Sequence, residues 1–572
     1  MVLECTGGGT SGLTLATRLS EDPSVSVIVI EAGPANLDDP EILNPALIDN
    51  RFGRPEYDWG FQTVPQKFCK DRSVPFNRGK GLGGSSALNF LQYHRPARSD
   101  IDALGELGNQ GWNWELLEPY YAKSERFILP VEKNNTLTYD VAHHGLDGPL
   151  AVGFPTPLST FEHPFQMAMK NLGIDLIKDP IKGAWYTPVT IDPTERVRSY
   201  AANKYYQPNA SRENLTVVVC AQVTKIVTEL DHNALATAVE VVFHNEEALY
   251  TVKVGKEVIL SAGTIMSPQI LELSGIGDRT ILQEFDIEPR VHLPGVGENV
   301  QEHFFSGVVS EVRPEVVSEL YQTSGTGIFG IPPTCISFVP LATISADHET
   351  LQKSLATLIN EAISSKRISP SLQKQYEITL KHQQDREPSC EFILWPLWRP
   401  IPNTPAPGKQ YLIVSTLLNH PISRGSIHIA SSDPLVPPKI NPRYFEYEYD
   451  LLQLVEQIKF ARKILDQEPV KNLLAGNELS PGRDVQTDEQ IADFVKSALS
   501  TTWHTVGSCS MLPLEDGGVV DSRLKVHSTT NIRVIDMSII PLHICAHTQA
   551  TAYALGELGA DIIKGKALIS GD

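Results

Sequence analysis

The sequence predicts an α/β fold in which helices cover a parallel sheet and the middle of the chain forms a second domain. Residues 1–33 alternate strand, glycine turn, helix and strand, which is one βαβ unit. Its second strand, SVSVIVI, is a β-branched run of the kind that a parallel sheet buries. Residues 311–499 differ, because proline-rich patches there alternate with polar helices at 347–366 and 448–467. A length of 572 residues also exceeds what one core usually supports.

The remaining elements follow in chain order. Residues 34–76 are rich in Pro, Asn and Asp and favour an extended loop. A second glycine cluster, NRGKGLGGSSALNF, comes next, and residues 112–126 predict a helix. Residues 215–260 alternate in the β manner, which predicts hairpins and a final strand at 257–261. SPQILELSGIG predicts a short helix, and the chain closes with a strand at NIRVID and a helix near TQATAYALGELGADIIK.

Charge and cysteine content exclude several functions. The chain has 48 Lys and Arg against 68 Asp and Glu, a formal net charge of −20. That field would repel nucleic acids and anionic bilayers, and no apolar run approaches the roughly 18 residues of a membrane span. The 7 cysteines form no CxxC pair and no Cys/His cluster. We therefore expect no nucleic-acid partner, no membrane partner and no metal site.

The turn after the first strand has the glycine spacing that holds a dinucleotide. Gly7 permits a tight turn, Gly9 lets the backbone approach a pyrophosphate, and Gly12 lets the helix pack on the strand. The N–H groups at the start of the helix would then face the phosphates. Glu31 ends the second strand, where a carboxylate can accept hydrogen bonds from ribose hydroxyls. The domain is therefore expected to be Rossmann-like, although FAD and NAD share this fingerprint.

Motifs spread over nearly the whole chain resemble those of one family. The second glycine cluster matches its first long signature through Asn89, and residues 263–277 match its second, with Glu272 where an aliphatic residue is usual. Shorter matches are YDWGF (57–61), VGENVQEH (296–303), PISRGSIHI (421–429), WHTVGSCSM (503–511), VIDMSIIP (534–541) and AHTQATAYALGELGAD (546–561). The chain thus resembles the glucose–methanol–choline (GMC) flavin oxidoreductases, in the branch of fungal aryl-alcohol oxidases and patulin synthase.

The resemblance implies FAD and two domains built from separated segments. A Rossmann-like FAD-binding domain would take residues 1–150, 215–310 and 500–572, and an α+β substrate domain with a mostly antiparallel sheet would take 151–214 and 311–499. Some members tether the flavin through a histidine at the position of Leu88, so FAD should be non-covalent here. The residues that match FAD contacts are Gly7, Gly9, Thr10, Ser11, Gly12, Glu31, Gly83, Gly84, Ser85, Asn89, Val223, Asp536, Thr548 and Gln549.

His504 and His547 match the catalytic pair of the family. Oxidation of an alcohol removes a hydroxyl proton and a hydride from one carbon, so a base must take the proton as the hydride leaves for flavin N5. A neutral imidazole titrates near working pH and suits this role. We expect His504 to be the base and His547 to hold the substrate oxygen by a hydrogen bond. The helix that begins near Thr548 would direct its partial positive charge at the flavin.

Aromatic residues near these motifs suggest the substrate. We expect the pocket to be lined by Phe90, Phe392, Trp395, Trp398 and Trp503, although aromatic side chains serve equally often as core. Together they favour a flat, apolar alcohol, aromatic, allylic or from secondary metabolism, over a sugar, which needs dense polar contacts. The product would be an aldehyde, ketone or lactone.

Two other functions remain open at this point. The family includes non-redox lyases and a versicolorin-type cyclase, in which the same histidines would do acid–base chemistry, and a pseudoenzyme without flavin would contradict the intact glycine motifs. Whether O₂ or another acceptor reoxidises the flavin, and whether the chain is a monomer or a homodimer, are also open.

The compartment and the start of the chain raise one expectation. Three Asn-x-Ser/Thr sequons, at Asn134, Asn209 and Asn214, accompany no signal peptide. Glu4 and Cys5 stand in the first strand where aliphatic residues are usual, and a buried Glu4 would be costly unless paired. A secretory parent with a longer N-terminus would account for both observations, and a cytoplasmic protein is the alternative.

Overall fold

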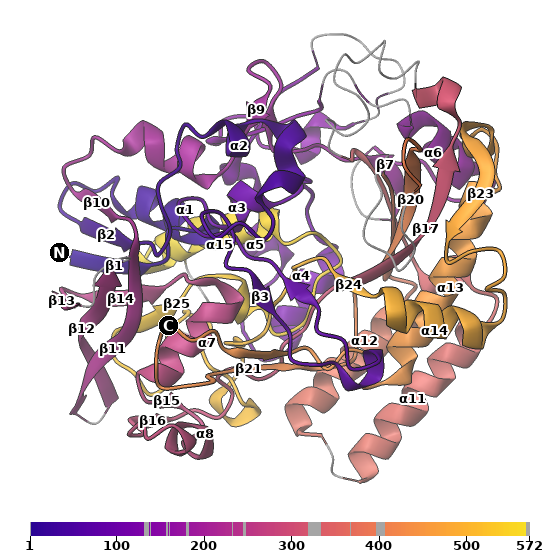
Figure 1. The fold of residues 1–572 in the computed structure, drawn as a ribbon. Helices are drawn as coiled ribbons and strands as arrows, with labels where there is room; N and C mark the ends of the chain where they lie inside the picture. The colour runs from indigo at the N-terminus through magenta and orange to yellow at the C-terminus, as the bar shows by residue number, and fades with distance from the viewer. Residues whose placement is uncertain are drawn as a thin grey trace.

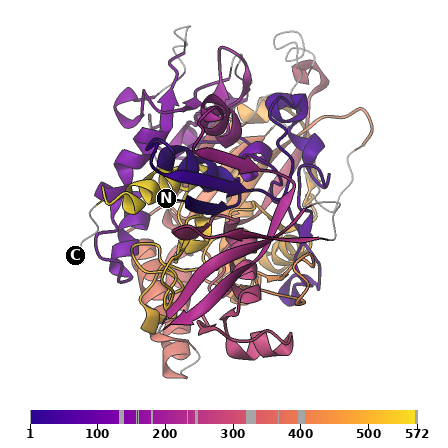
Figure 2. The same cartoon turned by 90° about the vertical axis from the view of Figure 1, so that its left-hand side faces the viewer.

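The computed structural model describes residues 2–130, 137, 139–155, 158, 161–178, 182–231, 233–243, 248–317, 333–365, 368–395 and 406–567. Two sheets organise these residues, a parallel one at the left of Figure 1 and a long antiparallel one at its right. Figure 2 views the same molecule from the side of the parallel sheet, with the antiparallel domain behind it. The mixed α/β architecture confirms the predicted fold class.

The first sheet is parallel throughout, although its strands come from distant parts of the chain. The strand order is β10-β2-β1-β14-β25. The bounds are β1 (Val2–Thr6), β2 (Ser26–Ile30), β10 (Leu215–Val218), β14 (Glu257–Leu260) and β25 (Ile532–Val534). Helix α1 (Thr10–Leu19) connects β1 to β2, and α15 (Gln549–Ile563) packs on α1. The first strand, the first helix and the last helix of the chain are therefore neighbours.

The predicted hairpins form a sheet of their own. Strands β11 (Ala221–Asp231), β12 (Asn233–Phe243) and β13 (Leu249–Lys253) pair antiparallel between β10 and β14. Helix α7 (Gly263–Leu273) follows β14 and packs against β11. Both agree with the alternation and the helix expected from the sequence.

The second sheet is antiparallel and has the order β23-β17-β20-β19-β18-β7, with β24 beside β17. Its strands are β7 (Gly183–Tyr186), β17 (Phe304–Val312), β18 (Cys335–Val339), β19 (Cys390–Trp395), β20 (Tyr411–Leu418), β23 (Leu474–Ser480) and β24 (Ser500–Thr501). Strand β7 lies in the predicted segment 151–214, and β17 begins at Phe304, ahead of residue 311, where the sequence placed the start of the second segment of the substrate domain. Every residue of β20 is buried, because helices cover one face and the other turns toward the first domain.

Helices cover the outer face of this sheet. Helix α13 packs directly on β17 and β20, and its apolar residues share one core with those strands. The longer helices of this domain are α6 (Glu162–Asn171), α11 (His348–Ser364), α12 (Pro370–Gln384), α13 (Glu448–Leu465) and α14 (Asp488–Ala498). Helices α11 and α13 match the two polar helices predicted from the sequence, and α5 (Trp114–Ser124) matches the helix predicted at 112–126.

The segment expected as extended loop contains two short helices in addition to the 3₁₀ turn η2 (Lys67–Cys69). These are α2 (Pro40–Leu43) and the 3₁₀ helix η1 (Pro45–Arg51), and proline occupies the first turn of each. Asp39 and Asn44 precede them, and their side chains accept hydrogen bonds from the amides of Glu41 and Ala46. Residues that favour turns also cap helices, which is why composition alone was misleading here.

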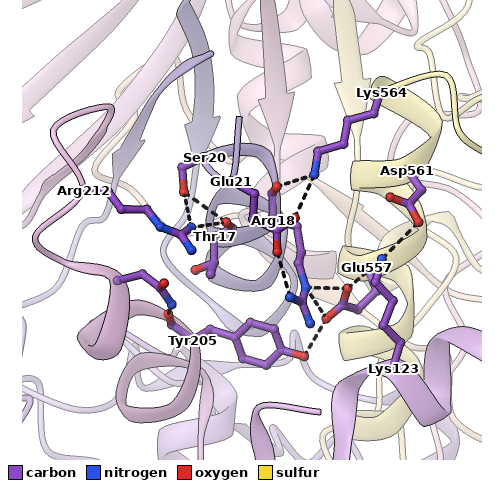
Figure 3. Close-up of polar contacts among 11 residues, drawn as sticks. Thr17, Arg18, Ser20, Glu21, Lys123, Tyr205, Arg212, Glu557, Asp561 and Lys564 are labelled. Carbon is purple, nitrogen blue, oxygen red and sulfur yellow. Dashed lines mark hydrogen bonds and ion pairs between the residues drawn. The ribbon is translucent and has the colours of Figure 1, made fainter. Parts of the chain in front are cut away.

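An ion-pair network fastens the last helix to the first (Figure 3). The buried carboxylate of Glu557 on α15 accepts from Arg18 Nε at 2.8 Å and from the hydroxyl of Tyr205 at 2.9 Å, and it pairs with Lys123 at 3.3 Å. Burial raises the pKa of Glu557, while the charges of Arg18 and Lys123 oppose that rise. The start of α15, which lies in the functional site described below, is therefore held in place relative to α1.

Two of the three sequons lie in the described part of the chain. The amide nitrogen of Asn214 donates to the carbonyls of Ser20, Asp22 and Val25, and that of Asn209 donates to Tyr205. A glycan replaces one of the two hydrogens on the amide nitrogen, so on Asn214 it would displace at least one of the three hydrogen bonds; Asn134 lies outside the described residues. No helix among the described residues is long and apolar enough to cross a membrane.

Candidate functional site

The glycine turn after β1 has an opening for a ligand. A Cβ at Gly12 would overlap the carbonyl oxygen of Gly7, so this glycine is required for the packing of α1 on the turn. A Cβ at Gly9 would meet nothing closer than Gly84 Cα at 3.9 Å, and its φ of −80° suits any residue. The protein itself therefore does not require glycine at position 9, whereas a group lying against the turn would.

Two helices begin at this opening without a side-chain cap. Helix α1 starts after Gly9 and α15 after Thr548, and neither has a side-chain hydrogen bond to its first turn. Both starts line one continuous cavity. Uncapped amide groups of a long helix bind anions and electron-rich groups, so the two ends fit the phosphates and the ring of a flavin dinucleotide.

Glu31 connects the two glycine clusters. Its carboxylate accepts from the amides of Gly8 and Gly33 at 2.8 Å and of Gly81 at 3.0 Å. Burial raises the pKa of Glu31, and these three amides oppose the rise. Oxygen Oε2 takes only one of the three bonds, which leaves lone-pair capacity for a ribose hydroxyl on the cavity side.

The second glycine cluster lies directly on the first. The amide of Gly83 donates to the carbonyl of Gly8 at 2.8 Å, and α3 (Ser85–Leu88) leads to Asn89. The amide nitrogen of Asn89 donates to Gln549 at 2.7 Å, and its oxygen accepts from Arg198 at 2.8 Å. Arg198 is fully buried, and burial lowers its pKa well below the ordinary value. No sequence signal pointed to Arg198, because it lies more than a hundred positions from the residue that it holds.

The cavity collects most of the predicted site residues. Val223 lines it from β11, and Asp536 lines it from the end of β25 while accepting from Gly263 at 3.0 Å and Ser267 at 2.6 Å. Gly12 and Gly83 lie behind it, in the packing of the two glycine clusters. The predicted residues along its wall are Gly7, Gly9, Thr10, Ser11, Glu31, Gly84, Ser85, Asn89, Phe90, Val223, Trp395, Trp503, His504, Asp536, His547, Thr548 and Gln549.

Phe392 lies on the opposite face of its strand from the cavity. It is fully buried against α13, where its ring lies 5.2 Å from that of Phe460. Alternate residues of a strand point to opposite faces, so Ile393 and Trp395 can line the cavity only if Phe392 faces the helices. The period of two in FILW could have revealed this; Trp398 lies outside the described residues.

The two predicted histidines meet at the end of the cavity, with ring centres 4.6 Å apart. Their partners differ. Nδ1 of His504 lies 3.0 Å from Nδ1 of His303 and 3.0 Å from the hydroxyl of Thr502. Nε2 of His547 lies 2.8 Å from the buried carboxylate of Glu391. Burial, with the neighbouring charges of His547 and His543, holds the pKa of His504 well below its ordinary range.

Backbone contacts orient both rings. The amide of His504 donates to Glu302 at 2.6 Å, and the amide of His547 donates to Nε2 of His94 at 3.0 Å. Burial raises the pKa of Glu302 to about 7, although Arg78 and the groups that donate to Glu302 oppose this. Sequence reasoning missed Glu302, Glu391 and His94. Glu302 lies inside the motif VGENVQEH and His94 lies between Tyr93 and Pro96 of the first signature, whereas a glutamate in a strand, such as Glu391, normally indicates an exposed edge.

Aromatic rings form the wall of the cavity beside the histidines. Phe52 stacks on Trp503 at 5.0 Å and on Phe90 at 5.5 Å, and Trp395 meets Phe90 edge-on at 5.1 Å. The wall continues with Phe305, Ile393 and Leu417. Phe52 was missed because it lies in the segment taken for loop. This part of the cavity offers flat, apolar surface and few polar partners apart from the two histidines.

One further buried cluster lies behind the histidines. Asp100 accepts from Nε2 of His420 at 2.8 Å and from the amide of Cys545 at 2.7 Å, and His382 lies 3.8 Å from it. Burial raises the pKa of Asp100, but His420, His382 and the amide of Cys545 together outweigh it, so the pKa is lowered overall. The three side chains have metal-ligand spacing, which the sequence scan missed because they are far apart in the chain. The carboxylate is already satisfied, and it fixes the loop that precedes His547.

Two family models match the chain, both described as GMC oxidoreductase, one over residues 5–305 and the other over residues 421–556. The chain is 35% identical to GMC oxidoreductase family protein Mala s 12 of Malassezia sympodialis, over 98% of this chain and 91% of that protein. It is 30% identical to patulin synthase of Aspergillus clavatus, over 98% of this chain and 91% of the synthase.

Solved structures give the same result at the level of the fold. An FAD-dependent oxidoreductase from Chaetomium thermophilum superposes with a TM-score of 0.87 at 28% identity, covering 99% of both chains. A fungal aryl-alcohol oxidase superposes with a TM-score of 0.85 at 27% identity, covering 99% of this chain and 98% of the oxidase.

Proposed function

The chain belongs to the GMC oxidoreductase family of FAD enzymes, and from that premise we propose that it oxidises an apolar aromatic or allylic alcohol, such as one of secondary metabolism, with His504 as base. The single observation that carries the proposal is the asymmetry of the histidine pair. One imidazole has only neutral partners at its ring, while the other faces a carboxylate, and both lie in the cavity that contains the dinucleotide turn.

The chain's own residues fit the cofactor. FAD supplies the acceptor for the hydride when it is bound. Gly9 and the open starts of α1 and α15 would receive its phosphates and ring, with Glu31 at the ribose and Asp536 on the opposite wall. Leu88 offers no nucleophile for a covalent link, so the cofactor should be released when the protein is denatured.

His504 is the better base of the pair. An alcohol is a very weak acid, so its hydroxyl proton must pass to a neutral acceptor as the carbon–hydrogen bond breaks. The low pKa of His504, caused mainly by burial, keeps its ring neutral at working pH. A ring without a formal charge and without a carboxylate partner can take the proton and give it up again in the same cycle.

His547 would hold the substrate oxygen. Glu391 accepts a hydrogen bond from its Nε2 and fixes the ring, and His94 fixes its backbone. An imidazole held in this way positions the hydroxyl between the two histidines, which lowers the entropic part of the barrier. This hydrogen bond of His547 orients the substrate hydroxyl, and the hydroxyl proton goes to His504 instead.

The wall of Phe52, Phe90, Trp395 and Trp503 supports the proposed substrate class. Planar rings stack on such a wall, whereas a sugar would leave its hydroxyl groups without partners there. The similarity to a fungal aryl-alcohol oxidase and to patulin synthase agrees with this class. Oxygen or another acceptor would complete the cycle.

Anaerobic spectroscopy tests the proposal. Benzylic and allylic alcohols should bleach the flavin absorbance of the holoenzyme, while glucose should not. His504→Ala should keep its flavin and lose about 10²- to 10⁴-fold in the rate of bleaching, the usual contribution of a general base. Turnover of an alcohol without bleaching at any stage would contradict oxidation and favour a non-redox lyase or cyclase. An unchanged rate in His504→Ala would remove His504 from the base role.

A further inference from the structure

A chain of buried contacts behind His504 ends at a backbone carbonyl. Nε2 of His303 lies 3.0 Å from the carbonyl oxygen of Asn419. A carbonyl can only accept, so Nε2 of His303 must carry a proton and donate it. His303 is fully buried, and burial, with the charges of His543 and His504, holds its pKa well below the ordinary value. A neutral imidazole has one ring proton, so Nδ1 of His303 can only accept.

The protonation state of His303 determines which ring nitrogen of His504 carries a proton. Its Nδ1 lies 3.0 Å from Nδ1 of His303, and two lone pairs at that distance would repel each other. The hydroxyl of Thr502 gives a second and independent constraint. It donates to the carbonyl of His303 at 2.9 Å, so towards Nδ1 of His504, 3.0 Å away, it presents lone pairs. Both neighbours therefore require a proton on Nδ1 of His504.

We infer that His303 and Thr502 are positioning residues that hold neutral His504 in the Nδ1–H tautomer, with the lone pair of Nε2 available to the substrate. The inference deepens the proposed function and rests on it for its catalytic meaning. In the proposed step the O–H bond of the alcohol breaks, an N–H bond forms at Nε2 of His504, and the hydride of the same carbon leaves for the cofactor. The proton on Nδ1 stays in place throughout.

The partners of His504 also differ from those of the familiar serine–histidine–aspartate arrangement. In that arrangement a carboxylate on Nδ1 stabilises the protonated imidazole. Here the ring of His504 faces neutral groups at Nδ1, and Glu302 contacts its backbone amide instead. The groups around it that can carry a positive charge are His547, His543, Arg78 and His94. Protonated His504 is therefore poorly stabilised, which favours rapid return of the proton.

A matched set of substitutions at position 303 separates orientation from packing. In His303→Asn the side-chain oxygen can replace Nδ1 and accept from His504. In His303→Gln the amide nitrogen of the longer side chain can donate to the Asn419 carbonyl, but no acceptor remains at the position of Nδ1. His303→Leu removes both contacts. We expect the rate of flavin reduction to fall less than about 5-fold in His303→Asn and about 10- to 100-fold in the other two, the usual effect of losing the partner that orients an imidazole. KM should change little.

The pH profile gives a readout that simple loss of packing would not move. In the wild type the ring of His504 should stay neutral well below pH 6.5. The rate of flavin reduction should therefore not change over that pH range. His303→Asp places a carboxylate beside Nδ1 of His504 and should raise the pKa of that ring, so the acid limb of the profile should move to higher pH. Equal rates in wild type and His303→Leu, or equal losses in His303→Asn and His303→Leu, would overturn the inference.

A spectroscopic test does not depend on turnover. A ¹H–¹⁵N long-range spectrum of holoenzyme labelled at histidine, with His504 assigned through His504→Gln, shows which ring nitrogen carries the proton. We expect the ring proton of His504 on Nδ1 in the wild type and a mixture of the two tautomers in His303→Leu. A proton on Nε2 in the wild type would refute the inference even if alcohols are oxidised. A proton on Nδ1, with no alcohol reducing the flavin, would leave the inference standing and refute the proposed function. Flavin content confirms that each variant is folded.

Discussion

Gly9 and Gly12 differ in what a methyl group would meet. At Gly12 a Cβ overlaps the carbonyl of Gly7, and at Gly9 the nearest atom is 3.9 Å away. Gly12→Ala should therefore destabilise the apoprotein by about 1–3 kcal/mol, the typical cost of overpacking. Gly9→Ala should leave its stability within about 0.5 kcal/mol but weaken FAD binding about 10- to 100-fold.

Urea denaturation of the two apoproteins and FAD titration by fluorescence check this pair. Gly12→Ala serves as the control for a change that acts through the fold. Wild-type FAD affinity in Gly9→Ala would show that the cofactor does not lie against Gly9.

Glu4 is the buried charge that the sequence marks as costly. It is fully buried in β1, both carboxylate oxygens lack a partner among the described residues, and burial raises its pKa to about 8. Because the pKa is raised in the folded state, the native protein binds the proton more tightly. The stability from this group is therefore complete below about pH 4.5 and is lost as the pH rises to about 8.

Glu4→Val should remove that loss. We expect the variant to be more stable than the wild type by about 1–3 kcal/mol at pH 9, the cost of an unsatisfied buried polar group, and to differ less at pH 5. Glu4→Gln is the control, because it removes the charge and keeps a buried polar group. Urea midpoints at both pH values measure the effect, and parallel pH profiles for wild type and Glu4→Val would contradict it.

At the scale of elements, the ion pairs of Glu557 connect α1, α5 and α15 (Figure 3). Its partners Arg18 and Lys123 would lose their buried counter-charge and keep only the more exposed Glu21 and Asp561, and breaking a buried ion pair costs about 3–5 kcal/mol. We expect Glu557→Ala to lower the free energy of unfolding by that amount and to loosen FAD binding, because α15 begins at the cofactor site. Thermal and urea unfolding of apoprotein and holoenzyme measure both.

Lys564→Ala, at the C-cap of α15, is the matched control. Lys564 pairs with Glu21, whose side chain is 41% exposed, and a pair of this kind contributes only about 0–1 kcal/mol. A loss in Glu557→Ala no larger than in Lys564→Ala would show that the buried network does not hold α15.

The elements themselves could be predicted to different degrees. Period-two and period-3.6 patterns located β2, β11–β14, α11 and α13, because each pattern records which face is buried. The same rule, applied to FILW, would have separated Phe392 from Trp395. Helices α2 and η1 were not predicted, because they are too short to show a helical period. Their capping residues are also the residues that are common in loops.

At the scale of the whole molecule, the cavity joins the two domains. Its walls come from β1, α3, β11, α15 and, in the antiparallel sheet, from Phe305, Trp395 and Leu417. A ligand there should stabilise both domains together. FAD at 100 times its Kd should add about 2.7 kcal/mol of stability and shift one cooperative unfolding transition. Calorimetry of apoprotein with and without FAD checks this; two transitions, of which FAD moves only one, would contradict it.

The sequence by itself determined the family and the cofactor turn, and it pointed to the two histidines that we propose for the chemistry. These follow from local patterns, because a phosphate turn and a catalytic loop are each built within a few consecutive residues. Only the tertiary structure decided what surrounds them: that Arg198 holds Asn89, that Glu391 faces His547, and that the Asn419 carbonyl orients His504 through His303. Each of those contacts joins residues that are distant in the chain. A contact between distant residues produces no local sequence pattern from which it could be predicted.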